Sequence, residues 1–305
     1  MDKVISVIQT ALPVFLALGL GMLCRSKQFL TREGIDALKK VVLNITLPFV
    51  LHNAFATAEY SLAALLLPVL VFLLCCGALV LGKLWVKCFR ISSRLVPFLA
   101  TGFEAGMLGY ALFVLLFPDV SVSHFALLDL GQTLFVFTLY KILLSGKSDI
   151  KAIGKDMVTS PILWAVFAGV IIGATGLYGA MKNWGVSGIF DSVSGFLSTP
   201  TGMIILLTVG YDLVLREIPW KRTAGAIAMR LVVMTVVMGI ILALNRTVLK
   251  GMIFEGAALL MVILPPPYVI PVFADEPAER VHISSALSAL TLVTMVLFAL
   301  LCIIV

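Results

Sequence analysis

Ten apolar stretches of about 20 residues dominate this chain, and a helix of that length crosses a bilayer once. They are 4–24, 41–57, 62–82, 95–117, 122–144, 159–179, 188–213, 223–244, 254–273 and 282–304. Of the 305 residues, 61% are hydrophobic and only 12% are charged, whereas a globular domain carries about 25% charged residues. The sequence therefore predicts an all-α integral membrane protein with ten transmembrane helices, which form a single membrane domain over residues 1–305.

The basic residues gather in alternate loops. Of the 22 Lys and Arg residues, 17 lie in or beside the loops that follow the first, third, fifth, seventh and ninth spans. Loops rich in Lys and Arg face the cytoplasm, so both termini are expected on the non-cytoplasmic side. The net charge of +6 is explained by this topology, and a nucleic-acid partner is not expected.

Five spans in each half is an odd number, so a duplicated unit lies upside down relative to its partner. We therefore expect two inverted five-helix repeats, at approximately 1–145 and 156–305. Corresponding spans share small features: the first and sixth each have a proline followed by two glycines, and the second and seventh each have one proline. These residues are Pro13, Gly19 and Gly21; Pro161, Gly169 and Gly173; and Pro48 and Pro200.

The fourth and ninth spans occupy matching places in the two halves, and both are interrupted. The fourth contains Glu104 among the glycines Gly102, Gly106 and Gly109, and the ninth contains Pro265-Pro266-Pro267. Unwound backbone is tolerated inside a membrane only where it is buried in protein or lines a cavity. A pair of broken crossover helices therefore indicates the substrate site of a secondary transporter.

Glu104 is the leading functional candidate among the polar residues within the spans. It lies nine residues into the fourth span, roughly 14 Å along a helix, and so near the middle of the hydrocarbon. A charge at that depth costs at least about 2.5–3.5 kcal/mol, which favours a functional role for this carboxyl group. The alternative is a structural role, in which Glu104 only hydrogen-bonds the freed backbone of the broken helix.

Four other polar residues are candidates for binding, coupling or support. Asp129 and Gln132 are three residues apart in the fifth span, so they share a helix face that either lines the cavity or steadies the crossover. Asn44 offers an amide group in the proline-containing second span and is expected to form a third wall of the site. Arg230 is either a counter-charge for an anion or a side chain that snorkels to the interface, and the second interpretation is favoured.

Three segments resemble the auxin efflux carrier family, which includes plant auxin exporters and bacterial malate- or malonate-type permeases. They are Lys40–Phe49, Glu104–Ala111 and Leu264–Tyr268, in the family's order over nearly the whole chain. The family's first crossover usually reads Asn-Thr-Gly-Phe-Leu-Gly-Leu-Pro, so Glu104 and Ala111 replace its Asn and Pro. The helix break is then expected to rely on Gly106 and Gly109. The resemblance implies ten spans, a scaffold and a transport domain, elevator-like movement and frequent homodimers.

The leading prediction is a secondary active transporter that moves a small organic anion, a carboxylate, by alternating access, with proton coupling through Glu104. The expected substrate-binding residues are Asn44, Glu104, Gly106, Gly109, Pro265, Pro266, Pro267 and Tyr268, and Glu104, Asp129, Gln132 and Arg230 are expected to couple or support. One alternative is a cation/proton antiporter, in which Glu104 and Asp129 bind H⁺ or Na⁺. Another is a membrane receptor that binds its ligand without transporting it.

Enzymatic activity is not expected, because the sequence contains neither an HExxH zinc motif nor a credible Ser/His pair. ATP-driven transport is not expected either, because the sequence has no GxxxxGK[ST] phosphate loop. No cofactor or metal site is predicted, since the five cysteines lack the paired spacing of a zinc site. By analogy, the membrane is expected to be a bacterial inner membrane.

Overall fold

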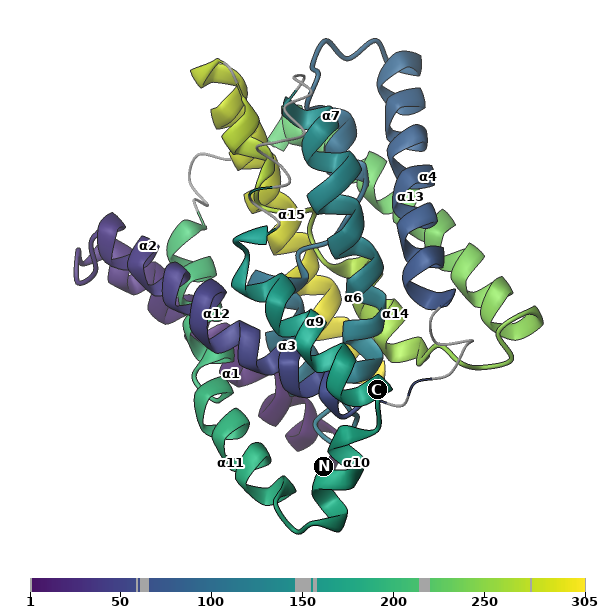
Figure 1. Cartoon of the computed structure of the whole chain (residues 1–305). Coiled ribbons are helices and arrows are strands. Elements are labelled where there is room, and N and C mark those ends of the chain that lie inside the picture. Colours follow the sequence, from purple (N-terminus) through teal and green to yellow (C-terminus); the bar gives the residue numbers. More distant parts are fainter. Residues whose placement is uncertain are drawn as a thin grey trace.

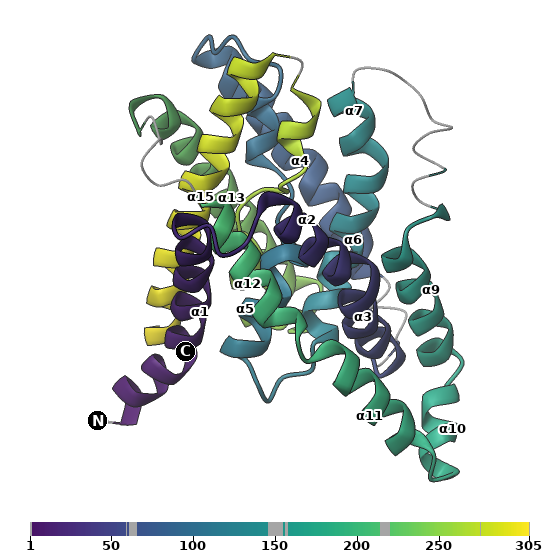
Figure 2. The ribbon, with the colours of Figure 1, turned by 90° about the vertical axis from the view of Figure 1, so that its left-hand side faces the viewer.

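The computed structural model describes residues 2–58, 60, 66–145, 155, 158–213, 220–274 and 276–304, and every regular element in these ranges is a helix. The start of the predicted third span at 62–65 and the boundary between the predicted repeats at 146–154 lie outside the described residues. The first residues of α1 and the last residues of α15 lie toward the same end of the molecule (Figures 1 and 2).

The helices follow one another with short breaks. In the first half they are α1 (Asp2–Ser26), α2 (Arg32–Val41), η1 (Val42–Thr46), α3 (Leu47–Ala56), α4 (Leu66–Cys88), η2 (Val96–Ala100), η3 (Ala105–Gly109), α5 (Tyr110–Leu116), α6 (Ser123–Phe135), η4 (Val136–Tyr140) and α7 (Lys141–Ser145). In the second half they are α9 (Pro161–Ala174), α10 (Leu177–Asn183), α11 (Ser187–Ser198), α12 (Thr201–Asp212), α13 (Trp220–Thr247), α14 (Glu255–Ile263), η6 (Ile270–Phe273) and α15 (Pro277–Ile304).

Six helical stretches in the described ranges are long and apolar enough to cross a membrane, so the chain is a multi-pass membrane protein. They are Ile8–Ser26, Leu66–Cys88, Ser123–Leu144, Ser187–Asp212, Thr223–Thr247 and Pro277–Ile304. A seventh is added if α9 and α10 are taken as one span, which is bent by 62°. These seven correspond to the predicted first, third, fifth, seventh, eighth, tenth and sixth spans.

Within the described residues, the predicted second, fourth and ninth spans are not single apolar helices of that length. The predicted second span lies in the helical stretch formed by α2, η1 and α3, in which α2 carries charged residues. The predicted fourth and ninth spans are each interrupted by residues that are not helical. Ten spans and the inverted repeat therefore stay predictions.

Helix α1 packs closely against α12 because glycines face backbone at their contact. A Cβ atom on Gly21 would overlap the carbonyl oxygen of Leu207, and one on Gly210 would overlap the carbonyl oxygen of Leu18. Small residues let helix backbones approach closely where lipid supplies no hydrophobic drive for association.

Helices α3 and α9 make a second contact of the same kind. Gly169 and Gly173, four residues apart on α9, face the carbonyl oxygens of His52 and Phe55 on α3. The predicted first span thus packs on the predicted seventh, and the predicted second packs on the predicted sixth. In Figure 2 the two pairs lie on opposite sides of the molecule. Each of these two contacts thus joins a helix of the first half to a helix of the second half.

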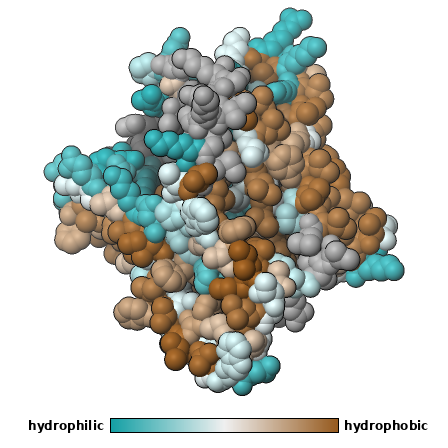
Figure 3. Space-filling view, in the orientation of Figure 1, coloured by the Kyte–Doolittle hydropathy of each residue, from teal (hydrophilic) through white to brown (hydrophobic). Residues whose placement is uncertain are grey.

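Large apolar side chains are exposed on the outward faces of the helices. Examples are Leu73 on α4, which is 59% exposed, and Val236 on α13, which is 45% exposed. Figure 3 shows apolar residues over the side where α4 and α13 lie in Figure 1, and hydrophilic residues over the end of α2. Contiguous apolar surface of this extent is rare on soluble monomers but suits contact with lipid.

Candidate functional site

The first interruption lies between η2 and η3, at residues 101–104. Gly102 has φ +66°, a left-handed conformation that L side chains rarely adopt, and a Cβ atom there would press on the ring of Pro267. The prediction that the break relies on Gly106 and Gly109 is wrong, because both lie inside the helical turn η3. The positive φ at Gly102 is what allows the chain to turn out of the helix.

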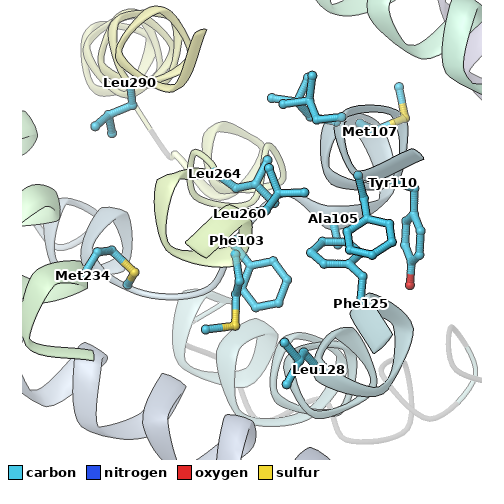
Figure 4. Packing of buried hydrophobic residues seen from close by; sticks show 14 of the residues in the cluster. Phe103, Ala105, Met107, Tyr110, Phe125, Leu128, Met234, Leu260, Leu264 and Leu290 are labelled. Carbon is cyan, nitrogen blue, oxygen red and sulfur yellow. The ribbon is translucent and has the colours of Figure 1, made fainter. Parts of the chain in front are cut away.

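Gly106 and Gly109 instead allow close packing. A Cβ atom on Gly109 would lie 2.7 Å from the Phe125 ring and 2.8 Å from a Leu264 methyl carbon. Figure 4 shows Phe125 and Leu264 near the turn that carries Ala105 and Tyr110. Gly106 is more open, since a Cβ atom there would lie 3.4 Å from a methyl carbon of Leu47. The first interrupted segment is therefore pressed against α6 and the end of α14.

The second interruption follows α14, and residues 264–269 are not helical. Pro265, Pro266 and Pro267 are all buried there, and none has an N–H group to continue the helix. Pro267 packs against Gly102, so the two interruptions meet each other directly. The structure thus brings together two parts of the chain that the sequence marked independently.

Glu104 makes three hydrogen bonds at the junction, two of which join the first interrupted segment to the second. Its backbone N–H donates to the carbonyl oxygen of Pro265 at 2.8 Å. Its side-chain Oε1 accepts from the N–H of Met107 at 3.0 Å, and Oε2 accepts from the N–H of Tyr268 at 2.7 Å. Both carboxyl oxygens are therefore engaged, each by the start of a different segment. The observed contacts are structural, and a coupling role for Glu104 stays a prediction.

Arg230 occupies the opposite side of the junction, where it donates to freed carbonyl oxygens. Its guanidinium reaches Leu264 O at 2.8 Å and Leu99 O at 3.3 Å, and the residue is only 3% exposed. The favoured interpretation that Arg230 snorkels to the interface is wrong. The side chain turns inward because the ends of η2 and α14 present carbonyl groups that lack helical partners.

Gln132 and Asp129 lie on the buried face of α6, but they have different partners. Gln132 Nε2 donates to the carbonyl oxygen of Phe103 at 2.6 Å, so it supports the first interruption. Asp129 Oδ2 accepts from the hydroxyl of Tyr110 at 2.8 Å, one turn beyond the interruption. Of the two interpretations offered by the sequence, the Gln132 contact fits support of the crossover.

Two hydroxyl groups also donate to backbone carbonyl oxygens next to the interruptions. Tyr140 donates to Phe98 O at 3.1 Å, and Thr294 donates to Ile263 O at 2.6 Å. Unpaired carbonyls are costly in a bilayer, so these side chains from surrounding helices make the interruptions tolerable. They also hold the two segments in one defined geometry.

A cavity of about 690 Å³ adjoins both interrupted segments. Met107 and Tyr268 line it from the first and second segments, and Arg25, Arg32 and Lys39 line it from α1 and α2. We call this the basic cavity. Among the residues that the structure describes, its one acidic lining residue is Asp212, at the end of α12, whose carboxylate pairs with both Arg32 and Lys39.

In the sequence, these cations indicate the orientation of the chain in the membrane but do not by themselves mark a binding site. A usable signal was present: Arg32 and Lys39 are seven residues apart, two helical turns, and so lie on one face of the amphipathic helix α2. What the spacing does not reveal is that α2 lies beside the interrupted segments.

A second cavity, of about 710 Å³, lies beyond the interruption, and none of the described residues that line it is charged. Tyr110, Val50 and Leu206 line this charge-free cavity. Along α12 and the first interrupted segment, its lining begins about one turn from that of the basic cavity. Along the chain, the buried residue Leu47 comes after Leu43, which lines the basic cavity, and before Val50, which lines the charge-free cavity.

Asn44 is not brought to either described cavity. Its side chain is on the exposed face of η1 and donates to the carbonyl oxygen of Lys40 at 2.8 Å. The amide thus satisfies helix backbone four residues earlier instead of joining the other candidates.

The chain is similar to a protein of Methanothermobacter thermautotrophicus that is named an uncharacterized transporter. The two sequences are 27% identical over 213 residues, and the match covers 67% of each chain. No protein-family model matches the chain. The similarity is consistent with a non-enzymatic protein and, together with the apolar helices, supports a transporter in general.

Proposed function

We propose that this protein is a secondary transporter for a small organic anion, a carboxylate, which it moves by alternating access. The observation that carries the proposal is the basic cavity, which is lined by three cationic side chains and by both interrupted segments. Membership of the auxin efflux carrier family and a homodimeric assembly are parts of the same proposal, based on the resemblance of the crossover segments.

The charges of the basic cavity favour an anion. Arg25, Arg32 and Lys39 outnumber the carboxylate of Asp212, which leaves the described lining with a net positive charge. Guanidinium and ammonium groups donate charge-assisted hydrogen bonds to carboxylates, and the planar guanidinium does so with two parallel bonds. An entering carboxylate therefore competes with Asp212 for Arg32 and Lys39.

The two cavities support alternating access. On α12, Val209 lines the basic cavity and Leu206, one turn away, lines the charge-free cavity. Met107 and Tyr110 are related in the same way on the first interrupted segment. A movement of the interrupted segments against α1, α3 and α12 would therefore change access to both cavities. The reciprocal packing of α1 on α12 and α3 on α9 supports the inverted repeat that such movements use.

The Glu104 junction supports proton coupling. An ionised carboxylate accepts both N–H groups through charge-assisted hydrogen bonds, whereas a protonated carboxyl group meets one of them with a hydroxyl oxygen, which is a weaker acceptor. Protonation therefore loosens one of the two segments that adjoin the basic cavity. The predicted consequence is transport that depends on pH through Glu104.

The proposal is tested with Lys39→Gln and its neighbour Lys40→Gln, because Lys39 lines the basic cavity and Lys40 does not. Thermal shifts are measured with mono- and dicarboxylates and with Na⁺ at two pH values, and uptake is measured in proteoliposomes. A ligand at 100 times its Kd stabilises a protein by about 2.7 kcal/mol. We expect a carboxylate to stabilise the parent and Lys40→Gln but to act much more weakly on Lys39→Gln.

Other outcomes would contradict the proposal in distinct ways. Stabilisation by Na⁺ alone would indicate a cation/proton antiporter. Binding of a carboxylate without any uptake or exchange would indicate a receptor. Equal loss of binding in both lysine variants would show that the basic cavity does not hold the anion.

A further inference from the structure

Two of the three cations that line the basic cavity are already paired with carboxylates of the protein. Arg32 Nη1 lies 2.5 Å from an oxygen of Asp212, and Arg32 Nε lies 3.4 Å from an oxygen of Asp36. Lys39 pairs with the second oxygen of Asp212. Two carboxylates thus balance the charges of these two cations. A ligand carboxylate gains Arg32 or Lys39 only by competing with a carboxylate that the protein itself supplies.

The third cation is Arg25, in the last turn of α1, and it forms no salt bridge with any residue that the structure describes. Among the same residues its side chain has one hydrogen-bond acceptor, the carbonyl oxygen of Tyr211, at 3.4 Å from Nη1. That distance is longer than the usual 2.7–3.2 Å, and a guanidinium has five N–H donors. Because Arg25 is exposed and lines the cavity, its free donors are available to a ligand.

The free guanidinium and the paired cations meet at the same end of α12. Arg25 contacts the carbonyl oxygen of Tyr211, and the next residue, Asp212, holds Arg32 and Lys39. Consecutive residues lie only 3.8 Å apart at their Cα atoms. An anion that binds Arg25 is therefore brought close to the carboxylate with which it must compete for the other two cations.

We propose that Arg25 is the first residue to bind the carboxylate of the transported anion, and that Arg32 and Lys39 are engaged only after Asp212 is displaced. The inference rests on the proposed function and assigns an order to cations that the proposed function treats alike. The planar guanidinium holds both oxygens of a carboxylate through two parallel hydrogen bonds, which an ammonium group does not reproduce. Arg25 is thus a specificity-determining residue and not only a source of positive charge.

The role of Arg25 is tested by titration calorimetry of the full-length protein in lipid nanodiscs at pH 7, with acetate, butyrate, succinate and citrate as ligands. Arg25→Gln is matched with Lys27→Gln, because Lys27 is an exposed cation two residues further along that does not line the basic cavity. Arg25→Gln should weaken binding about ten- to hundredfold, since charge-assisted hydrogen bonds are lost. Lys27→Gln should change it less than about twofold. Arg25→Lys keeps the cation and should regain part of the lost affinity.

The order of binding is tested by combining Arg25→Gln with Asp212→Asn. Without the carboxylate of Asp212, Arg32 and Lys39 are open to the ligand, so loss of Arg25 should weaken binding by a smaller factor than in the parent. A double-mutant cycle measures this difference. Equal factors in the two backgrounds would overturn the proposed order.

Two further outcomes distinguish this inference from the proposed function. Equal affinities of Arg25→Gln and Lys27→Gln would overturn the role of Arg25 while leaving anion binding in place. Absence of binding of all four acids by the parent would contradict the proposed function itself, and the inference with it. Equal melting temperatures of Arg25→Gln and Lys27→Gln without ligand are expected and would show that the weaker binding does not come from a disturbed fold. If Arg25→Gln melts lower, Arg25→Lys carries the test through the change in affinity from parent to lysine.

Discussion

Glu104 links Met107 to Tyr268, which is 164 residues further along the chain than Glu104. One carboxyl group thereby fixes the spacing of two segments that the chain connectivity leaves independent. Its two oxygens serve as acceptors for two backbone N–H groups, and no neutral side chain of the same length offers two acceptors in this geometry.

Glu104→Gln should therefore destabilise the protein. The Gln side chain keeps one acceptor oxygen but places an NH₂ donor against the other N–H group, which leaves a backbone donor unsatisfied. We expect the free energy of unfolding to fall by about 1–3 kcal/mol. Thermal unfolding in nanodiscs measures this change, and Glu255→Gln, which alters an exposed carboxyl on α14, is the control. A melting temperature equal to the parent's would show that the two contacts contribute little.

Arg230 has the complementary role, because it donates to the carbonyl ends of η2 and α14. Arg230→Met keeps an apolar side chain of similar length but leaves both carbonyls unpaired. The free energy of unfolding should fall by about 1–3 kcal/mol, measured in the same unfolding assay. Arg246→Met, at the exposed end of the same helix, should change it by less than about 0.5 kcal/mol. Similar values for the two variants would contradict a specific role for Arg230.

At the scale of elements, glycine contacts set the distance between α1 and α12. Gly210→Ala should be destabilising by about 1–3 kcal/mol, because its methyl group would overlap the backbone of Leu18 and force the helices apart. Gly225→Ala, on α13, is the matched control, since no described residue comes within 4 Å of the position of its new methyl group. That control should be neutral or slightly stabilising, because Ala favours a helix over Gly. Thermal unfolding of the two variants distinguishes them.

Arg32 and Lys39 of α2 line the basic cavity, and both form salt bridges with Asp212 at the end of α12. Asp212→Asn removes a competing negative charge, so a carboxylate should bind several-fold more tightly if it uses Arg32 and Lys39. Titration calorimetry with the carboxylate that gives the largest thermal shift measures the change. The control is Asp191→Asn, on α11, since Asp191 is exposed and does not line this cavity. Weaker binding in Asp212→Asn would instead show that Asp212 mainly positions the cations.

At the scale of the whole molecule, the predicted topology has both ends of the chain on the non-cytoplasmic side. The start of α1 and the end of α15 lie toward the same end of the structure, which agrees with an even number of crossings (Figure 2). Alkaline phosphatase fused after Val305 should be active, and green fluorescent protein at the same place should be dark. Fusions after Arg90, in a loop predicted to be cytoplasmic, should behave in the opposite way. Fluorescence from green fluorescent protein fused after Val305 would show that the C-terminus is cytoplasmic and would contradict the predicted orientation.

The sequence alone determined that this chain is helical and membrane-embedded, because a long apolar helix satisfies its own backbone in lipid wherever it occurs. It also marked both interrupted segments, since three prolines and a cluster of glycines disturb a helix by local sterics. The position of the first break was harder to predict, because Gly102, Gly106 and Gly109 look alike in sequence and, of these three, only Gly102 adopts a positive φ.

Only the tertiary structure decided what the polar residues contact. Arg230 turns inward because freed carbonyls from two distant segments meet beside it, and Asn44 turns outward because the nearby Lys40 carbonyl satisfies its amide. Arg32 and Lys39 became part of a candidate site only once α2 was placed beside the interrupted segments. Hydrophobicity and backbone sterics act over a few residues and can be read along the chain, whereas hydrogen bonds and ion pairs between segments depend on how the helices pack.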